Sequence, residues 1–167
     1  MNMIVSADKN WGIGKNNELL FRTKGDMAYF RHLTIGGGVI MGRKTLDSLP
    51  GGRPLPDRDN IVLTRDKSFE REGVSVCHSL KELFKLISGA DDKFFVIGGE
   101  QIYRQLMPYC KRAHITKWDA EADADAFIPD FDADESWMLM DYSEPRSEDE
   151  ISYKFCTYFN KKPQSLK

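Results

Sequence analysis

Four short, continuous runs of apolar residues constrain the fold of this chain more than any other feature. They are residues 3–5, 39–41, 61–63 and 94–97. A run without polar alternation is typical of a central strand that is covered on both faces. Amphipathic helix patterns lie between several of these runs, so the sequence predicts an α/β fold with helices against both faces of a sheet.

The most clearly predicted helix covers residues 79–87. Ser79 and Glu82 form an S-x-x-E capping box at its start. One face then carries apolar side chains at helical spacing, namely Leu80, Leu83, Phe84 and Ile87. A second helix is expected from about Glu100 to Met107, where Pro108 ends it.

The C-terminal part of the chain changes to an alternating pattern. Odd and even positions from Ile151 to Phe159 are expected to point to opposite faces of a strand, with residues 137–142 as its antiparallel partner. We therefore predict a single α/β domain over residues 1–162. It has a central mixed, mostly parallel β-sheet, an antiparallel C-terminal hairpin and about four flanking helices. Residues 163–167 are expected to form a disordered tail.

The composition argues against several classes of function. The 167 residues carry a formal net charge of −2, without the basic stripe that nucleic-acid binding favours. No apolar run approaches the length of a membrane span, and no signal peptide pattern begins the chain. Three widely spaced cysteines indicate free thiols in a reducing compartment: Cys77, Cys110 and Cys156. We expect a cytoplasmic monomer that binds small molecules, with no membrane or nucleic-acid partner.

Glycine, hydroxyl and basic residues follow three of the apolar runs. Residues 42–45 (GRKT) follow the second run, Thr64 and Arg65 the third, and residues 98–99 (GG) the fourth. Glycine lets a ligand approach the backbone, and amides at a helix start hold anions. Each feature alone is explained as well by a tight turn or a solvated basic surface. Together they favour a nucleotide, although the chain has neither G-x-G-x-x-G nor a P-loop motif.

Asp26 is the acidic residue that most clearly indicates a catalytic or ligand-binding role. At the start of a helix it would need no explanation beyond capping. However, it shares one helix face with apolar residues at the i+3, i+4 and i+7 positions, which are Tyr29, Phe30 and Leu33. A carboxylate on an apolar face is costly without a partner, and a cationic or hydrogen-bond-donating ligand would supply one.

The sequence predicts no metal site. The three histidines have no ligand-like spacing with the cysteines. Within the acidic segment 119–135, the residues from Asp130 onward resemble the start of a calcium loop, but Glu135 stands where that loop requires glycine. We interpret this segment as a solvated loop.

The order of these motifs resembles that of the dihydrofolate reductase family along almost the whole chain. Residues 11–17 (WGIGKNN) are similar to the start of its mobile active-site loop, and Asp26 stands at the position of its essential acid. Its other signature segments are similar to residues 39–45 (VIMGRKT), 52–60 (GRPLPDRDN), 96–99 (VIGG), 101–103 (QIY) and 115–117 (ITK). The resemblance implies NADPH-dependent reduction of 7,8-dihydrofolate to 5,6,7,8-tetrahydrofolate for one-carbon metabolism, and binding of antifolates.

The resemblance also implies roles on the substrate side. Asp26 would be the catalytic residue and would bind the 2-amino group and N3 of the pterin, assisted by Thr116. Arg58 would hold the α-carboxylate of the glutamate tail in a bidentate pair. Apolar side chains would enclose the pterin and benzoyl groups: Ile4, Val5, Met27, Phe30, Leu49 and Leu55.

On the cofactor side, the resemblance places Arg43, Lys44 and Arg65 around the 2′-phosphate of NADPH. A cis peptide would join Gly98 to Gly99. The other residues expected to bind the cofactor are Ser6, Ile13, Gly14, Leu19, Gly42, Thr45, Leu63, Thr64, His78, Ile97, Glu100, Gln101, Ile102 and Tyr103. No acidic residue is expected close enough to these strand ends to mimic the ribose-binding carboxylate of NAD sites. The sequence therefore predicts a preference for NADPH over NADH on the order of a hundredfold.

Some positions depart from the family pattern. Leu20 and Phe21 stand where Pro-Trp is usual, and Thr23 and Lys24 where Leu-Pro is usual. Two further replacements, of a tryptophan and a threonine, are Leu46 and Ala126. Phe21 lacks an indole N–H, so a water usually held there would lose a partner. We expect these changes to affect loop motion, rate and inhibitor affinity rather than the reaction itself.

Two other functions stay open at this point. The related pyrimidine reductase of riboflavin synthesis shares the fold and cofactor, but its substrate has no glutamate tail for Arg58 to hold. A non-catalytic protein that binds a pterin or NADPH would tolerate phenylalanine at position 21. An assay with dihydrofolate and NADPH separates these possibilities.

Overall fold

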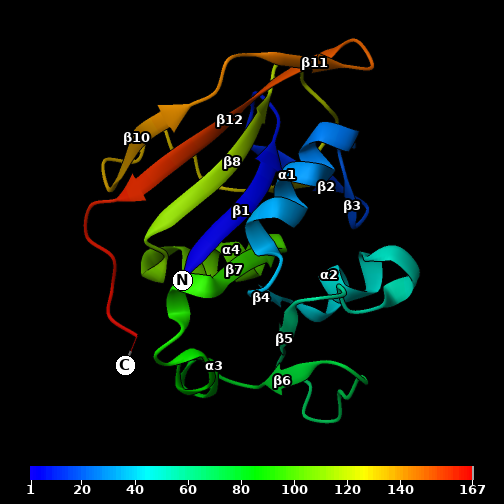
Figure 1. The fold of residues 1–167 in the computed structure, drawn as a ribbon, viewed down its shortest axis with the longest axis vertical. Helices are drawn as coiled ribbons and strands as arrows, with labels where there is room; N and C mark the ends of the chain where they lie inside the picture. Colours follow the sequence, from blue (N-terminus) through cyan, green and yellow to red (C-terminus); the bar gives the residue numbers. More distant parts are fainter. Residues whose placement is uncertain (167) are drawn as a thin grey trace.

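One central sheet runs through the molecule in the order β10-β12-β8-β1-β7-β4-β5-β6, and β11 pairs with β12 beside this path (Figure 1). It contains the strands expected at the four apolar runs and near the C-terminus, together with β6 and β11, which were not predicted. The computed structural model describes residues 1–166. In this part of the chain the sheet has nine strands: β1 (Asn2–Ala7), β4 (Gly38–Met41), β5 (Asp59–Leu63), β6 (Ser75–Cys77), β7 (Phe94–Gly98), β8 (Arg112–Trp118), β10 (Trp137–Tyr142), β11 (Arg146–Glu148) and β12 (Ile151–Asn160). The strands from β8 to β6 are parallel, whereas β12 runs antiparallel to β8 and to β10. The predicted mixed, mostly parallel sheet is therefore confirmed.

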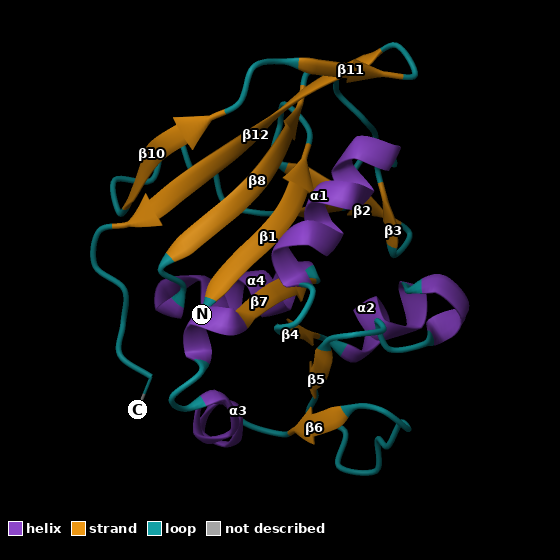
Figure 2. Ribbon diagram, in the orientation of Figure 1, coloured by secondary structure: helices purple, strands orange, loops and turns teal. Residues whose placement is uncertain are grey.

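Helices cover both faces of this sheet, and Figure 2 shows α1 in front of it and α4 behind it. Within residues 1–166 there are four α-helices: α1 (Lys24–Thr34), α2 (Arg43–Ser48), α3 (Leu80–Ile87) and α4 (Glu100–Leu106). Short 3₁₀ helices lie at Pro50–Gly52, Asp91–Lys93 and Met107–Tyr109. A small second sheet consists of β2 (Gly12–Lys15), β3 (Glu18–Leu19) and β9 (Ala126–Phe127).

Alternate residues of the central strands pack into two separate apolar clusters. The larger cluster joins one face of the sheet to α3 and α4, and includes Ile40, Val96, Leu83 and Leu106. The smaller cluster joins the other face to α2, and includes Val39, Met41, Val62 and Leu46. The continuous apolar runs are thus covered on both faces, because successive side chains of a strand point in opposite directions.

The helix ends largely follow the predicted capping signals. At α3, the Ser79 hydroxyl accepts a hydrogen bond from the Glu82 backbone N–H (3.2 Å), while the Glu82 carboxylate reaches the N–H of His78 (2.8 Å). Helix α1 begins two residues before Asp26, because the Thr23 side chain caps it by accepting from the Asp26 N–H (3.2 Å). Thr23, which departs from the family pattern, therefore starts the helix that carries the acid.

Two peripheral segments are anchored to the domain. The predicted solvated loop 119–135 is not wholly solvated, because the buried Phe131 ring contacts Trp11 and Trp137. After β12, the Gln164 N–H donates to Pro108 O (2.9 Å) and Leu166 packs against the larger cluster, whereas Lys167 lies outside the described residues.

The cysteines are buried free thiols, as the sequence indicates. No helix among residues 1–166 is long and apolar enough to cross a membrane. Over the same residues, no cluster of three or more His, Cys, Asp or Glu side chains is arranged to hold a metal ion.

Candidate active site

A cavity of about 1420 Å³ lies at the carboxyl ends of the parallel strands. Its lining comes from strands β1, β5, β7 and β8, from α1 and the segment after α2, and from β2 and β3. Pockets for small ligands usually have volumes of roughly 300–1,000 Å³. This cavity is therefore large enough for two ligands side by side.

Asp26 presents a buried carboxylate to this cavity from the first turn of α1. Asp26 is only 6% exposed, and the Thr116 hydroxyl of β8 donates a hydrogen bond to its Oδ1 (2.7 Å). No hydrogen bond from the described residues reaches Oδ2. Burial raises the pKa of Asp26 above its ordinary value, the Thr116 hydrogen bond opposes this, and the charge of Glu148 adds to the rise. The site thus offers a carboxylate oxygen to a ligand that donates hydrogen bonds.

Arg58 is held near the C-terminal end of α1, opposite the end that carries Asp26. Its Nε donates to Pro56 O (2.9 Å), its Nη1 donates to the Thr34 hydroxyl (3.1 Å), and its guanidinium carbon lies 6.0 Å from the centre of the Phe30 ring. Burial lowers the pKa of Arg58, and the nearby charge of Arg31 lowers it further. These contacts fix the plane of the guanidinium and leave other N–H groups of its fork for an anion.

Glycines bring the ends of β4 and β7 close together. The Gly42 N–H donates to Gly98 O (2.8 Å), and the Gly98–Gly99 peptide is cis, as the resemblance implies. A Cβ on Gly98 would lie 2.9 Å from the Tyr103 ring, and one on Gly42 would lie 3.1 Å from Ile102. Side chains at either glycine would therefore disturb this junction, which leaves bare backbone beside the cavity.

Three cations surround the other end of the cavity: Arg43, Lys44 and Arg65. Two acids accompany them. Arg43 Nη1 lies 3.5 Å from a carboxylate oxygen of Asp47, and Asp66 lines the cavity beside Arg65. The sequence predicts that no acid is placed to mimic the ribose-binding carboxylate of NAD sites. The turn after β5 nevertheless brings Asp66 to the cavity, where its N–H donates to the Thr64 hydroxyl (3.2 Å). Hydrogen bonds from Ser68 lower the pKa of Asp66, so it carries its charge at neutral pH.

The segment between β2 and β3 forms a hairpin that reaches across to α2. Asn16 and Asn17 both have positive φ (49° and 62°), which a two-residue hairpin turn requires. The Asn17 side-chain amide donates to Lys44 O (2.8 Å), and Ile13 and Leu19 of the flanking strands line the cavity. Through the contact between Asn17 and Lys44, the hairpin connects Ile13 and Leu19 to the cationic end of the cavity.

Comparison with known proteins decides the family. A family model described as dihydrofolate reductase matches residues 1–160. The chain belongs to the dihydrofolate reductase family. It is 41% identical over 164 residues to the dihydrofolate reductase of Bacillus subtilis (strain 168), which covers 96% of this chain and 95% of that protein. It is also 36% identical over 156 residues to the dihydrofolate reductase of Haemophilus influenzae, with 93% of this chain and 94% of that protein covered.

A solved structure agrees with this assignment. Dihydrofolate reductase from Enterococcus faecalis, complexed with NADP(H) and RAB-propyl, is 30% identical and superposes with a TM-score of 0.82 over 95% of each chain. The fold predicted from the sequence is therefore confirmed at the level of the whole domain.

The cavity brings together almost all the residues that the sequence and the family resemblance singled out. The predicted substrate residues in its lining are Ile4, Val5, Asp26, Met27, Phe30, Leu49, Leu55, Arg58 and Thr116. The predicted cofactor residues in the lining are Ser6, Ile13, Gly14, Leu19, Gly42, Arg43, Lys44, Thr45, Leu63, Thr64, Arg65, His78, Ile97, Gly99, Glu100, Gln101, Ile102 and Tyr103. Gly98 is outside this lining, and its contribution is the backbone contact with Gly42.

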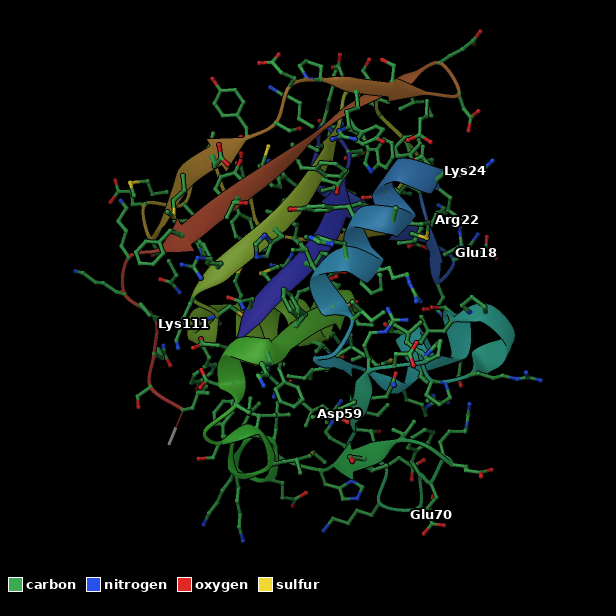
Figure 3. All side chains as sticks on the ribbon, viewed as in Figure 1. Glu18, Arg22, Lys24, Asp59, Glu70 and Lys111 are labelled. Carbon is green, nitrogen blue, oxygen red and sulfur yellow. The ribbon has the colours of Figure 1, made fainter. Side chains whose placement is uncertain are left out.

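Several lining residues were not predicted. Arg31 follows Met27 at i+4 on α1, so helical spacing was a usable signal for it. Arg22 also lines the cavity, and Figure 3 shows it near Glu18, between β3 and the start of α1. No local pattern marks Arg22, because its position depends on how the hairpin packs against the domain.

The unusual residues of this chain are accommodated without loss of the site. The Phe21 ring packs against Trp118, with 5.2 Å between the ring centres. Leu46 is fully buried in the smaller apolar cluster, and Ala126 pairs with Gly14 on β2. Phe21 thus has a packing role, and nothing in the structure explains the particular choice of leucine at position 46.

Proposed function

We propose that Asp26 and Thr116 bind the pterin ring in the NADPH-dependent reduction of 7,8-dihydrofolate to 5,6,7,8-tetrahydrofolate, the activity of the family to which this chain belongs. The observation that carries this assignment is the buried carboxylate of Asp26, held at 2.7 Å by Thr116 beside a cavity of about 1420 Å³. A pterin presents its 2-amino group and N3 as neighbouring donors. Their spacing suits two carboxylate oxygens, in the way that a guanidinium suits a carboxylate.

Asp26 also promotes protonation of the substrate. When bound, NADPH supplies the hydride that reduces C6 of the pterin. The residues of the chain must favour the ring form that carries a proton on N5. The negative charge of Asp26 stabilises that cationic ring more strongly in a buried pocket than it would in water. We infer that Asp26 acts on N5 through this charge, while water delivers the proton.

Arg58 binds the glutamate tail in this proposal. The side chain is preorganised by Pro56 and Thr34, so little rotamer entropy is lost when it pairs with a carboxylate. Apolar side chains between Asp26 and Arg58 enclose the rest of the substrate: Ile4, Val5, Met27, Phe30, Leu49 and Leu55. Antifolates would occupy the same surface.

The remainder of the lining fits NADPH. The bare backbone around Gly42 and Gly99 allows close approach of a pyrophosphate, and the cations Arg43, Lys44 and Arg65 would hold the 2′-phosphate. The hairpin residues Ile13 and Leu19 would cover the nicotinamide and exclude water from it. The other predicted cofactor residues complete this surface.

We also propose that residues 1–162 fold as one cytoplasmic, monomeric domain. The buried free cysteines support a reducing compartment, since such thiols are typical of cytosolic proteins. Size-exclusion chromatography with light scattering measures the oligomeric state, and a dimer at micromolar concentration would contradict this part of the proposal.

The activity is tested by following NADPH absorbance with the purified chain. We expect loss of absorbance on addition of dihydrofolate, and none with the pyrimidine substrate of the riboflavin-pathway reductase. Asp26→Asn serves as the control for a reaction at this site. Binding of both ligands without turnover would support a non-catalytic binding protein, and turnover of the pyrimidine substrate would support the related reductase.

A further inference from the structure

The start of α1 is capped from a distant part of the chain. The Glu148 carboxylate of β11 accepts hydrogen bonds from the backbone N–H groups of Lys24 (3.1 Å) and Gly25 (3.0 Å). The next N–H, that of Asp26, is bound by the Thr23 hydroxyl. The N–H groups that begin a helix lack partners within the helix. Here Glu148 satisfies two of them through a contact that spans more than 120 residues of sequence.

Two neighbouring residues are adapted to this contact. The Tyr153 hydroxyl of β12 donates to the same Glu148 oxygen that binds Gly25 (2.6 Å). A Cβ at Gly25 would collide with both that oxygen and the Tyr153 hydroxyl. Glycine at position 25 therefore makes room for the carboxylate, and Tyr153 fixes its position.

The same elements carry the Asp26–Thr116 pair. Tyr153 pairs with Trp118 across β12 and β8, two residues along β8 from Thr116. Glu148 is therefore tied both to α1, which carries Asp26, and, through β12, to β8, which carries Thr116. The role that we assign to Glu148 rests on the proposed function. We propose that Glu148 is a positioning residue for the reaction, because its carboxylate caps α1, holds Asp26 opposite Thr116 and adds a negative charge behind Asp26.

The electrostatic environment of Asp26 supports this role. After burial, which raises the pKa of Asp26, Glu148 is the charged group that raises it further. Hydrogen bonds from Tyr153 and then from the Gly25 and Lys24 N–H groups lower the pKa of Glu148, so it stays ionised at neutral pH. The other charged or titratable groups here include Lys24, whose charge favours ionised Glu148, and Arg146, which pairs with Tyr153 across β11 and β12. The phenols of Tyr29 and Tyr153 are neutral at pH 7, and burial raises their pKa values further.

The test compares Glu148→Gln with Glu144→Gln. Both changes remove one negative charge from the segment between β10 and β12, but the exposed Glu144 side chain is not part of the cap on α1. The pKa of Asp26 is measured in the ligand-free protein by NMR of ¹³C-labelled aspartate carboxyl groups. We expect Glu148→Gln to lower it by roughly half a pH unit, from Coulomb interaction at a partly solvated distance, and Glu144→Gln to leave it unchanged.

The kinetic part measures kcat/KM for dihydrofolate against pH. The acidic limb should move down with the pKa of Asp26, since this limb reports ionisation of the free enzyme. Loss of the cap should also lower the melting temperature by about 2–4 °C. Equal behaviour of the two variants in the NMR titration would overturn the proposal. An inactive parent protein with the expected titration shift would instead contradict the proposed function and leave the coupling established.

Discussion

The two halves of the cavity present charge in different ways. In the half that we propose binds the substrate, Asp26 is 6% exposed and held by Thr116, and Arg58 is fixed by Pro56 and Thr34. On the cofactor side, the Arg43 side chain is 46% exposed and lies 3.5 Å from Asp47. Buried, fixed charges interact strongly with a ligand, whereas exposed charges are screened by water and salt. The substrate half should therefore be the more sensitive to mutation.

The half that we propose binds the cofactor also offers backbone groups to a ligand, in addition to its exposed side-chain charges. The junction of Gly42 and Gly98 and the segment that leads into α4 present backbone groups that no substitution of an arginine removes. The comparison thus predicts a graded response. Loss of the buried Asp26 charge should be severe and nearly independent of salt, loss of the half-buried Arg58 should have an intermediate effect, and changes at the cofactor cations should be mild and salt-dependent.

The largest effect is expected for Asp26→Asn. The shape of the side chain and the Thr116 contact are retained, but the charge that favours a protonated pterin is lost. Loss of such a contribution typically costs roughly two to four orders of magnitude in rate. Steady-state kcat at pH 7 checks this. Turnover within a few-fold of the parent would remove Asp26 from the mechanism.

Arg58→Leu should have the next largest effect. A charge-assisted, bidentate pair contributes roughly 1.5–3 kcal/mol net, so dihydrofolate should bind at least about tenfold more weakly. Small inhibitors that lack a glutamate should bind almost as before. Titration of both ligand types compares them, and an equal loss for both would indicate a folding defect rather than a lost carboxylate contact.

The double variant Arg43→Ala, Arg65→Ala sharpens the contrast on the cofactor side. The carboxylates of Asp47 and Asp66 partly neutralise the positive charge of these cations. We therefore expect the preference for NADPH over NADH to fall by about tenfold, a smaller loss than the sequence alone suggests. The KM for NADPH should rise, and that for NADH should stay nearly constant. Measurement of kcat/KM for both cofactors at low and high salt tests this. A parent enzyme that uses both cofactors equally would show that these cations form only a solvated surface.

The smallest effect concerns stability. The pKa of Asp26 is raised by burial above its ordinary value of 3.8, so the folded protein binds this proton more tightly than the unfolded chain does. Its ionised form therefore destabilises the fold at neutral pH, and this cost disappears below pH 3.8, where the group is protonated in both states. Asp26→Asn should raise the free energy of unfolding on the order of 1 kcal/mol at pH 7. Denaturant unfolding at pH 7 and pH 3.5 measures the difference, and a destabilised variant at pH 7 would contradict it.

Local patterns predict most of the fold. The apolar runs mark β1, β4, β5 and β7 because both faces of these strands are covered, so no polar alternation obscures them. The capping box at Ser79 marks α3 because its hydrogen bonds form between near neighbours. These features depend on interactions within a few residues, which a sequence displays directly.

The parts that escaped prediction depend on contacts between distant residues. The cap of α1 by Glu148 involves a strand near the C-terminus, and the position of Arg22 depends on the packing of the β2–β3 hairpin. Asp66 was missed because its place is set by the turn after β5, not by the strand. The positions of Asp26 and Arg58 at one cavity came from family resemblance, since no spacing along the chain brings them together.

The central claim is that the charge of Asp26 favours a protonated pterin, and the pH dependence of kcat for Asp26→Asn tests it most directly. Without that charge, the variant must take up substrate that is already protonated. Its rate should therefore rise as pH falls, by up to about tenfold per pH unit, and approach that of the parent, in which Asp26 becomes protonated at a raised pKa. A ratio of parent to variant that stays constant from acidic to alkaline pH would show that Asp26 acts only through binding geometry and would contradict the mechanism.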